Sequence, residues 1–339
     1  MTIRAPRESQ VTATAAVVRW YLRHHFGEPS DPGVVAMFCD PARVGAFAVE
    51  PHALRAGDGR ALFRLLVATS MFQRRQDVQI LRILRGISRR DADEIADAGR
   101  LLRLVDRCEC PNLRSTTALA ERCDLSKDER TREGTCAAKP DVACHLKRHT
   151  VLLKRYGHFG KVPTSLALMV REAGGPDLAA LRRAVLRRIP DPLDRARALE
   201  AELSRAWRVN QKIASMFLSA ITNPDLSRGL SPWSRGVDWT YFVVVDSNVD
   251  LFLASIRYRG GSSYDARREF VRALAREIDL SKLAPSLRPF NPRVVQQAMY
   301  LFMSAANRRA AETDCMHAGP TACAKCPTAL SARCPVRQR

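Results

Sequence analysis

Apolar residues recur at helical spacing along most of this 339-residue chain. They occupy positions i, i+3 and i+4, which lie on one face of an α-helix. We expect helices over residues 11–26, 59–72, 78–86, 91–105, 177–189, 191–207, 212–221, 264–278 and 292–310. Residues 241–245 are rich in β-formers, but no partner strand is near. The pattern therefore predicts an all-α protein.

Helix start signals support several of these boundaries. Asp91 can cap its helix, and a Pro at the first helical position follows a capping residue in Asp191-Pro192 and in Asn291-Pro292.

Two stretches interrupt the helical pattern. Residues 108–162 are polar, charged and rich in Cys, and residues 222–240 are rich in Pro, Gly, Ser and Trp. We interpret the first as an insertion and the second as a long loop. Trp233, Trp239 and Tyr241 could stack on nucleic acid from this loop, but packing is the expected role for at least two of them.

The formal net charge is +20. A basic surface of this size favours a polyanionic partner, and nucleic acid is the commonest one. No apolar run approaches the ~20 residues that a membrane span needs. The N-terminal residues lack the apolar core of a signal peptide. We expect a soluble cytoplasmic protein that binds no membrane.

Four cysteines near the C-terminus form a C-x7-C-x2-C-x7-C array: Cys315, Cys323, Cys326 and Cys334. In a chain that is not exported, clustered thiols are better interpreted as one metal site than as disulfides. Ligation by four cysteines suits a [4Fe–4S] cluster or a structural zinc ion.

A second group of thiols lies in the polar insertion. Its members are Cys108, Cys110, Cys123, Cys136 and Cys144, with His145 beside the last. Four of them, Cys108, Cys123, Cys136 and Cys144, could bind zinc, although the spacing matches no familiar zinc finger. A metal ion would explain how a segment with few apolar residues is stable.

Lys212 and Asp246 are the candidates for chemistry. Lys212 lies in the first turn of an apolar helix that begins at about Gln211, where the helix dipole disfavours the ammonium form. A neutral amine there is a nucleophile. Asp246 follows three valines and precedes another apolar helix. By residue type alone, a solvated lysine and a helix-capping aspartate are the simpler interpretation.

The order of the motifs adds a resemblance. The segments FRLLVATSMFQRRQD, NQKIASMFL, VVVDSNVDLFL and VVQQAMYLFMSAANRR precede the terminal cysteines. This series resembles the endonuclease III branch of the helix-hairpin-helix DNA glycosylases over residues 61–105 and 193–335. The family's K-T-A-like motif is matched by residues 212–214, its V-D-x-H motif by residues 245–248, and its C-x6-C-x2-C-x5-C loop by the terminal array.

The resemblance implies a two-lobed helix-hairpin-helix fold, a [4Fe–4S] cluster on the terminal array, and excision of a damaged or modified base from double-stranded DNA. The target base would be flipped out of the duplex. Lys212 would attack the sugar and form a Schiff base, which permits AP-lyase activity, and Asp246 would stabilise the developing positive charge. The protein would then be a monomer associated with the nucleoid.

The resemblance also implies DNA contacts. Gln73 would fill the gap left by the flipped nucleotide, and Arg74 and Arg75 would contact the opposite base or a phosphate. Arg208 and Asn210 stand where the family has a G-x-G hairpin, so their side chains would replace its backbone contacts to phosphate. Asn248 replaces the usual histidine beside the aspartate.

We expect three parts of the chain. Residues 1–58 would pack with the C-terminal lobe, residues 59–240 would hold a six-helix barrel with the insertion and a hairpin at about 200–221, and residues 241–339 would carry the cluster loop 315–334. Two alternatives remain open at this point. The chain could be a monofunctional glycosylase that uses water activated by the aspartate, or a non-catalytic, metal-stabilised DNA-binding protein.

Overall fold

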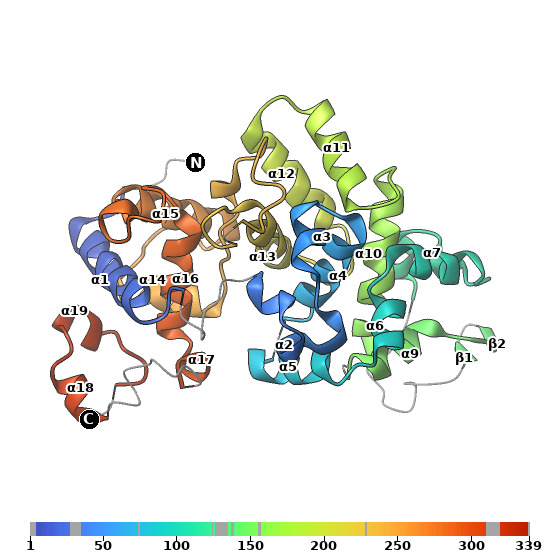
Figure 1. The fold of residues 1–339 in the computed structure, drawn as a ribbon, viewed down its shortest axis with the longest axis horizontal. Coiled ribbons are helices and arrows are strands. Elements are labelled where there is room, and N and C mark those ends of the chain that lie inside the picture. Colours follow the sequence, from blue (N-terminus) through green and yellow to red (C-terminus); the bar gives the residue numbers. More distant parts are fainter. Residues whose placement is uncertain are drawn as a thin grey trace. The chain divides into compact units, whose positions relative to one another are not determined.

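The computed structural model describes residues 5–27, 35–73, 75–123, 125, 135–136, 139–154, 157–227, 229–309 and 319–337. The described residues form two compact units, each considered by itself (Figure 1). Unit 1 draws on Met1–Val35, Asn223–Arg228 and Trp239–Arg339, and unit 2 on Ala36–Thr222 and Gly229–Asp238. Residues 36–58 thus belong to unit 2, whereas we expected them to pack with the C-terminal lobe.

Unit 1 contains only helices among its described residues. The α-helices are α1 (Glu8–His24), α14 (Ser247–Ser255), α15 (Tyr264–Arg276), α16 (Pro292–Met303), α17 (Ala305–Arg309), α18 (Pro320–Ala324) and α19 (Thr328–Ser331). Two 3-10 turns, η6 (Trp239–Tyr241) and η7 (Leu280–Lys282), lie between them.

Unit 2 is also helical, with one small pair of strands in its described part. The helices are η1 (Ala36–Cys39), α2 (Pro41–Val44), η2 (Gly45–Phe47), α3 (Pro51–Arg55), α4 (Gly59–Ser70), α5 (Asp77–Arg85), α6 (Arg89–Ile95), α7 (Ala98–Asp106), η3 (Pro111–Leu113), α8 (Thr116–Glu121), α9 (His145–Leu152), η5 (Gly157–Gly160), α10 (Lys161–Glu172), α11 (Leu178–Arg188), α12 (Pro192–Leu203) and α13 (Gln211–Thr222). The strands β1 (Thr135–Cys136) and β2 (Lys139–Ala143) pair antiparallel.

The predicted all-α class is confirmed. The β-rich run 241–245 forms no strand, and the strand pair lies instead in the Cys-rich insertion. The start signals at Pro192 and Pro292 are confirmed too. Asp191 accepts a hydrogen bond from Asp194 N at 2.8 Å, and Asn291 accepts one from Val294 N at 3.2 Å.

The single helix expected over residues 91–105 is wrong. It is broken into α6 and α7, because the Asp97 side chain accepts from Arg100 N at 2.9 Å and starts a new helix. Asp91 is not the cap of α6 either. Ser88 takes that position, and its hydroxyl accepts from Asp91 N at 3.2 Å. A Ser cap in the extended conformation satisfies an N–H that has no partner within the helix.

Helix α16 is the centre of unit 1, where it packs against α1, α14 and α15 (Figure 1). Val294, Val295, Ala298, Met299 and Phe302 are buried, so the helix presents a wide apolar face. A helix with so wide an apolar surface is stable only inside a core. It therefore fixes the framework on which α14 and the loop before it are held.

A buried polar network attaches residues 223–227 to the start of α16. Asn291 donates to Asp225 Oδ2 at 2.8 Å, and Asn223 donates to Asn291 Oδ1 at 2.9 Å. Arg288 forms an ion pair with Asp225. Buried polar groups that satisfy one another in this way specify one arrangement of a loop.

Unit 2 is built around α10, which packs against α4, α7, α8, α9 and α12. All of its residues from Lys161 to Val170 are buried. Helix α13 packs on α4 and α12, so α12 and α13 form a contacting helical pair. Residues 204–210 connect these two helices, within the range 200–221 where the sequence predicts a hairpin.

An acidic cluster on α6 meets two basic residues of α9. Glu94 lies 3.1 Å from Arg148 Nε and 3.4 Å from His149 Nε2. His149 lowers the pKa of Glu94 to about 2, against the desolvation that raises it, and Arg148 lowers it further. A carboxylate with a depressed pKa stabilises the fold above its ordinary pKa and loses that contribution as the pH falls.

We therefore predict that Glu94→Gln removes part of the acid sensitivity of unfolding. Between pH 4.5, the ordinary value for Glu, and about 2, the wild type should lose more stability than the variant. Denaturant midpoints measured at steps through this window check the prediction. Parallel curves for the two proteins would show that Glu94 does not link protons to folding.

None of the described helices is both long and apolar enough to span a bilayer.

Candidate functional site

Lys212 lies in the first turn of α13, as predicted, and is half-buried. Most of the helix after it is buried, including Ile213, Ala214 and Phe217. Among the described residues, no acidic side chain forms an ion pair with Lys212. Its amine is thus attached to a rigid element and is not neutralised within the described part of unit 2.

The turn before α13 contains one residue in the left-handed conformation. Arg208 has φ 63°, in the left-handed region that a side chain occupies at a cost of roughly 1 kcal/mol. Val209 is buried, and Asn210 caps α13 by accepting from Ile213 N at 3.2 Å. The turn thus forms without glycine, because Arg208 itself adopts a positive φ.

Aromatic stacking holds the turn in place. The Arg208 guanidinium lies 5.5 Å from the centre of the Trp207 ring, and Lys161 Nζ lies 4.7 Å from it. Trp207 N donates to Ser165 Oγ at 2.7 Å. Within the described residues, the buried Nε of Arg208 has no hydrogen-bond partner. A buried donor without a partner is costly, and a phosphate oxygen would satisfy it.

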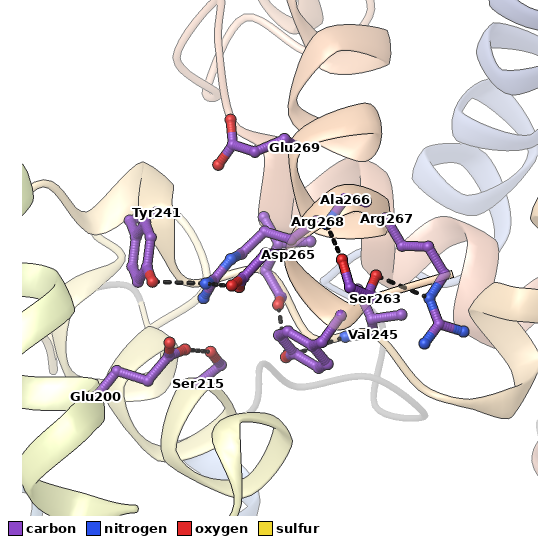
Figure 2. Close-up of polar contacts among 12 residues, drawn as sticks. Glu200, Ser215, Tyr241, Val245, Ser263, Asp265, Ala266, Arg267, Arg268 and Glu269 are labelled. Carbon is purple, nitrogen blue, oxygen red and sulfur yellow. Dashed lines mark hydrogen bonds and ion pairs between the residues drawn. The ribbon is translucent and has the colours of Figure 1, made fainter. Parts of the chain in front are cut away.

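A buried carboxylate supports α13 from α12. Glu200 is buried and accepts a hydrogen bond from Ser215 Oγ at 2.5 Å (Figure 2). This bond joins the two helices one turn beyond Lys212.

In unit 1, Asp246 is the N-cap of α14. Its Oδ1 accepts from Asn248 N and Val249 N, both at 3.0 Å. Across the described residues, its other oxygen, Oδ2, accepts no hydrogen bond, and the side chain is half-buried. The capping role expected from residue type is thus confirmed, and one carboxylate oxygen stays uncommitted.

Hydrogen bonds to the Tyr264 side chain hold the segment that leads to Asp246. Residues 242–245 are buried and belong to no helix or strand. The Tyr264 hydroxyl donates to Val243 O at 2.9 Å and accepts from Val245 N at 3.3 Å. Because Val245 immediately precedes Asp246, these bonds fix the backbone from which the carboxylate projects.

Arg268 of α15 adds further contacts near this segment. It is 2% exposed, lies 3.9 Å from the Tyr241 ring centre and 5.3 Å from that of Tyr264, and donates to the Tyr241 hydroxyl at 2.5 Å. It also pairs with Asp265 (Figure 2). On the same helix, Arg267 pairs with Asp250 of α14 at 2.6 Å. The start of α14 is therefore held by several contacts from one helix.

The described part of the terminal array brings three thiols to one cavity. Cys323 lies on α18, Cys326 follows it, and Cys334 follows α19. All three line a cavity of about 510 Å³ in unit 1, together with basic residues of α1. Cys315 lies outside the described residues.

The three thiols are close enough to influence one another. Burial raises the pKa of the Cys326 thiol, and Cys334 and Cys323 raise it further, while Arg308 and Arg337 oppose them. Arg308 is 1% exposed, donates to Cys334 Sγ at 3.3 Å and stacks 4.7 Å from the Trp20 ring centre. A thiolate donor set beside a buried guanidinium fits an anionic metal–thiolate group.

The described thiols of the insertion lie around one cluster as well. Cys108, Cys110, Cys123 and Cys144 pack against one small apolar cluster of unit 2. The side chain of Cys136, predicted as a ligand, lies outside the described residues. Burial raises the pKa of Cys123, the Cys144 and Cys110 thiols raise it further, and Lys161 lowers it.

In the part of the chain that the structure describes, no three His, Cys, Asp or Glu side chains are arranged to hold a metal ion.

The remaining predicted DNA contacts lie in the loop between α4 and α5. Gln73 is half-buried and donates to Ser70 O at 2.7 Å, so its amide folds back on the end of α4. Arg75 is exposed, and Arg74 lies outside the described residues. Asn248 lies in the first turn of α14 beside Asp246.

Of the aromatic residues near the long loop, two are packing residues, as expected. Trp233 and Tyr241 are buried, and Trp233 meets Phe217 edge to face at 6.4 Å. Trp239 is half-buried, with Arg288 5.9 Å from its ring centre.

Sequence reasoning missed several residues that shape these sites. Each of four residues contacts at least one partner more than ten positions away in the sequence: Tyr264, Arg268, Lys161 and Arg308. The sequence does contain one signal for two of them, namely a basic residue at a position of α15 or α10 that faces the core. A basic residue on an apolar helix face needs a partner when it is buried.

Searches against protein-family models, curated proteins and solved structures find no match to this chain.

Proposed function

We propose that this protein is a DNA glycosylase that removes a damaged or modified base and cleaves the resulting abasic site through a lysine Schiff base. The observation that carries the proposal is Lys212, a half-buried amine in the first turn of a buried helix that is paired with no acid among the described residues. The net charge of +20 supports DNA as the partner.

The chemistry assigns one role to each candidate residue. The Lys212 amine attacks C1′ of the sugar as the glycosidic bond breaks, and the base leaves with the bonding electrons. The Asp246 carboxylate stabilises the positive charge on the sugar and accepts the proton that the attacking nitrogen loses. As the C1′–O4′ bond of the sugar ring breaks, O4′ takes up that proton and C1′ becomes the protonated Schiff base. Loss of a C2′ proton to water then permits β-elimination, in which the C3′–O3′ bond breaks and the 3′ phosphate leaves.

Several side chains would bind and orient the DNA. Arg208, with its buried Nε, and Asn210 lie in the turn before Lys212 and would meet a phosphate. Gln73, Arg74 and Arg75 would occupy the space of the flipped nucleotide and its surroundings. Asn248 would be the polar neighbour of Asp246.

The terminal array would hold a [4Fe–4S] cluster through Cys315, Cys323, Cys326 and Cys334. Base excision transfers no electron, so the cluster would stabilise this region and orient its basic residues toward phosphate. The visible absorption of the purified protein distinguishes iron from zinc, because Zn²⁺ is d¹⁰ and colourless.

Release of free base from a panel of lesion-bearing duplexes tests the proposal. Each duplex is incubated with enzyme in excess, with and without alkali. A glycosylase with lyase activity nicks its substrate without alkali, and a monofunctional glycosylase needs alkali for nicking. Tight binding without base release from any duplex would identify a non-catalytic DNA-binding protein instead.

The hydrogen bonds of the Tyr264 hydroxyl to residues 243 and 245 give a more specific prediction. Tyr264→Phe deletes the hydroxyl that bonds Val243 and Val245, and the backbone before Asp246 becomes less constrained. We expect the single-turnover excision rate to fall by between about tenfold and 10²-fold with little change in DNA affinity, since misplaced catalytic groups lose rate rather than binding.

Tyr258→Phe is the matched control. Its hydroxyl donates to Gly261 O at 3.1 Å, also within unit 1 but away from residues 242–245. If both variants lost rate equally, the effect would reflect the stability of unit 1 and not the position of Asp246.

A further inference from the structure

Helix α11 of unit 2 is strongly basic. It packs beside α12 (Figure 1). Between Leu178 and Arg188 it contains four arginines and no acidic residue. Its apolar face, which includes Leu181 and Val185, is buried. The arginines therefore lie on the rest of the helix surface.

Two guanidinium groups are held on successive carbonyls of the segment 229–238, which also belongs to unit 2. Arg182 of α11 donates from Nη2 to Arg235 O at 2.7 Å, and Arg195 of α12 donates from Nη1 to Gly236 O at 3.0 Å. Two more carbonyls, near the end of α11, accept from Arg195 at 2.5 and 3.1 Å. All of these acceptors are neutral. Two positive charges are thus fixed near each other, and in the described part of the chain no acid pairs with either of them.

Arg182 keeps hydrogen-bond donors that the fold does not use. A guanidinium carries five N–H donors in a planar fork. The buried Nε of Arg182 has no hydrogen-bond partner among the described residues. Burial lowers the pKa of Arg182, and the charge of Arg195 lowers it further. An anion beside Arg182 would satisfy Nε and offset both positive charges.

Exposed arginines extend this positive charge along α11. Arg183 and Arg187 are exposed and lie one turn apart. Like charges at this spacing destabilise a helix when nothing neutralises them. No described acidic side chain pairs with either residue. A row of positive charges is complementary to the regularly spaced phosphates of a nucleic-acid strand.

We propose that Arg182, Arg183 and Arg187 bind backbone phosphates of DNA. The charge of Arg195 strengthens the attraction. This surface contacts the backbone alone and therefore reads no base sequence. It lies on α11, apart in sequence from the contacts expected in the turn before α13. The proposal rests on DNA as the partner, as the proposed function does, but not on the chemistry.

DNA affinity of the full-length chain, measured by fluorescence anisotropy over a range of salt concentrations, tests the proposal. The probe is an undamaged duplex, so binding is measured without base excision. Each phosphate contact adds about 0.9 to the slope of log K against log[salt]. Arg183→Ala/Arg187→Ala should therefore lower this slope by about 1.8. Between roughly 50 and 200 mM salt, the wild type should lose about tenfold more affinity than the variant.

Arg103→Ala/Arg107→Ala is the matched control. It also removes two exposed arginines that are four positions apart, at the end of α7. We expect this variant to keep the wild-type slope. Equal slopes for the two double variants would overturn the proposal, because net charge alone would then explain the result. All four side chains are exposed, so both variants should fold, and their thermal midpoints check this.

Arg182→Lys tests the guanidinium itself. Lysine keeps the positive charge and loses the planar fork. We expect DNA binding to weaken by about threefold to tenfold, the contribution of one hydrogen bond. The salt slope should stay that of the wild type, because the charge remains. Wild-type affinity in this variant would remove Arg182 from the site.

The DNA surface on α11 and the glycosylase proposal can fail separately. Equal slopes for the two double variants refute the surface alone, and binding without base release from any lesion-bearing duplex refutes the glycosylase alone. A wild-type chain that binds no duplex would refute both.

Discussion

Lys212→Ala should abolish the covalent adduct that borohydride traps between the enzyme and a lesion-bearing duplex. The Schiff base requires a primary amine at C1′, and alanine has none. Base excision should fall with it by several orders of magnitude, because the nucleophile of the first step is also removed. Alanine is the best helix former, so α13 should retain its stability.

Two further variants separate chemistry from charge. Lys212→Arg keeps a cation that can bind phosphate but cannot form a Schiff base. Lys282→Ala removes an exposed lysine, with 79% of its side chain accessible, and controls for general loss of positive charge. We expect no adduct from the arginine variant and a normal yield from Lys282→Ala.

The contrary outcomes are equally informative. An adduct that persists in Lys212→Ala would assign the Schiff base to another amine. Normal excision by Lys212→Arg, without nicking in the absence of alkali, would make Lys212 a phosphate-binding residue of a monofunctional glycosylase.

Asp246→Asn should lower the rate of base excision by about 10²- to 10³-fold, the usual cost of removing one preorganised electrostatic group. The amide is neutral, so it neither stabilises a cationic sugar nor accepts a proton. The variant is well suited to the question because Asn is as good an N-cap as Asp. The bonds from Asn248 N and Val249 N to Oδ1 can therefore persist.

Asp246→Ala provides the comparison. It loses the charge and the cap together, so it should unfold more easily than Asp246→Asn by about 0.5–2 kcal/mol. If the two variants excise equally slowly while differing in stability, the charge is responsible for the rate. Near-normal excision by Asp246→Asn would leave the residue with a capping role only.

How far the sequence predicts this protein differs from one feature to another. The helical class, the start of α13 at Gln211 and the caps at Asp191 and Asn291 follow from residues within one or two turns of each other. The break between α6 and α7 does not follow from periodicity, because the apolar residues keep helical spacing both before and after Asp97. Only the cap itself distinguishes two helices from one.

The candidate sites show the same division. Lys212 and Asp246 stand out from local context, since each lies at the start of an apolar helix. Tyr264 does not stand out, because its structural role depends on hydrogen bonds to Val243 and Val245, about twenty positions earlier. Spacing alone does not show that Cys110 reaches the cluster around Leu119, because that contact depends on how distant segments pack.

Sequence by itself determined the helical class, the basic charge and the residues capable of chemistry, because periodicity, net charge and side-chain type are local properties. Tertiary structure decided which of those residues are held and by what. It showed that Arg208 adopts a left-handed conformation and that Asp246 keeps one oxygen uncommitted. It also gathered four thiols of the insertion on one core. Such features arise from packing between distant segments, which no local pattern encodes.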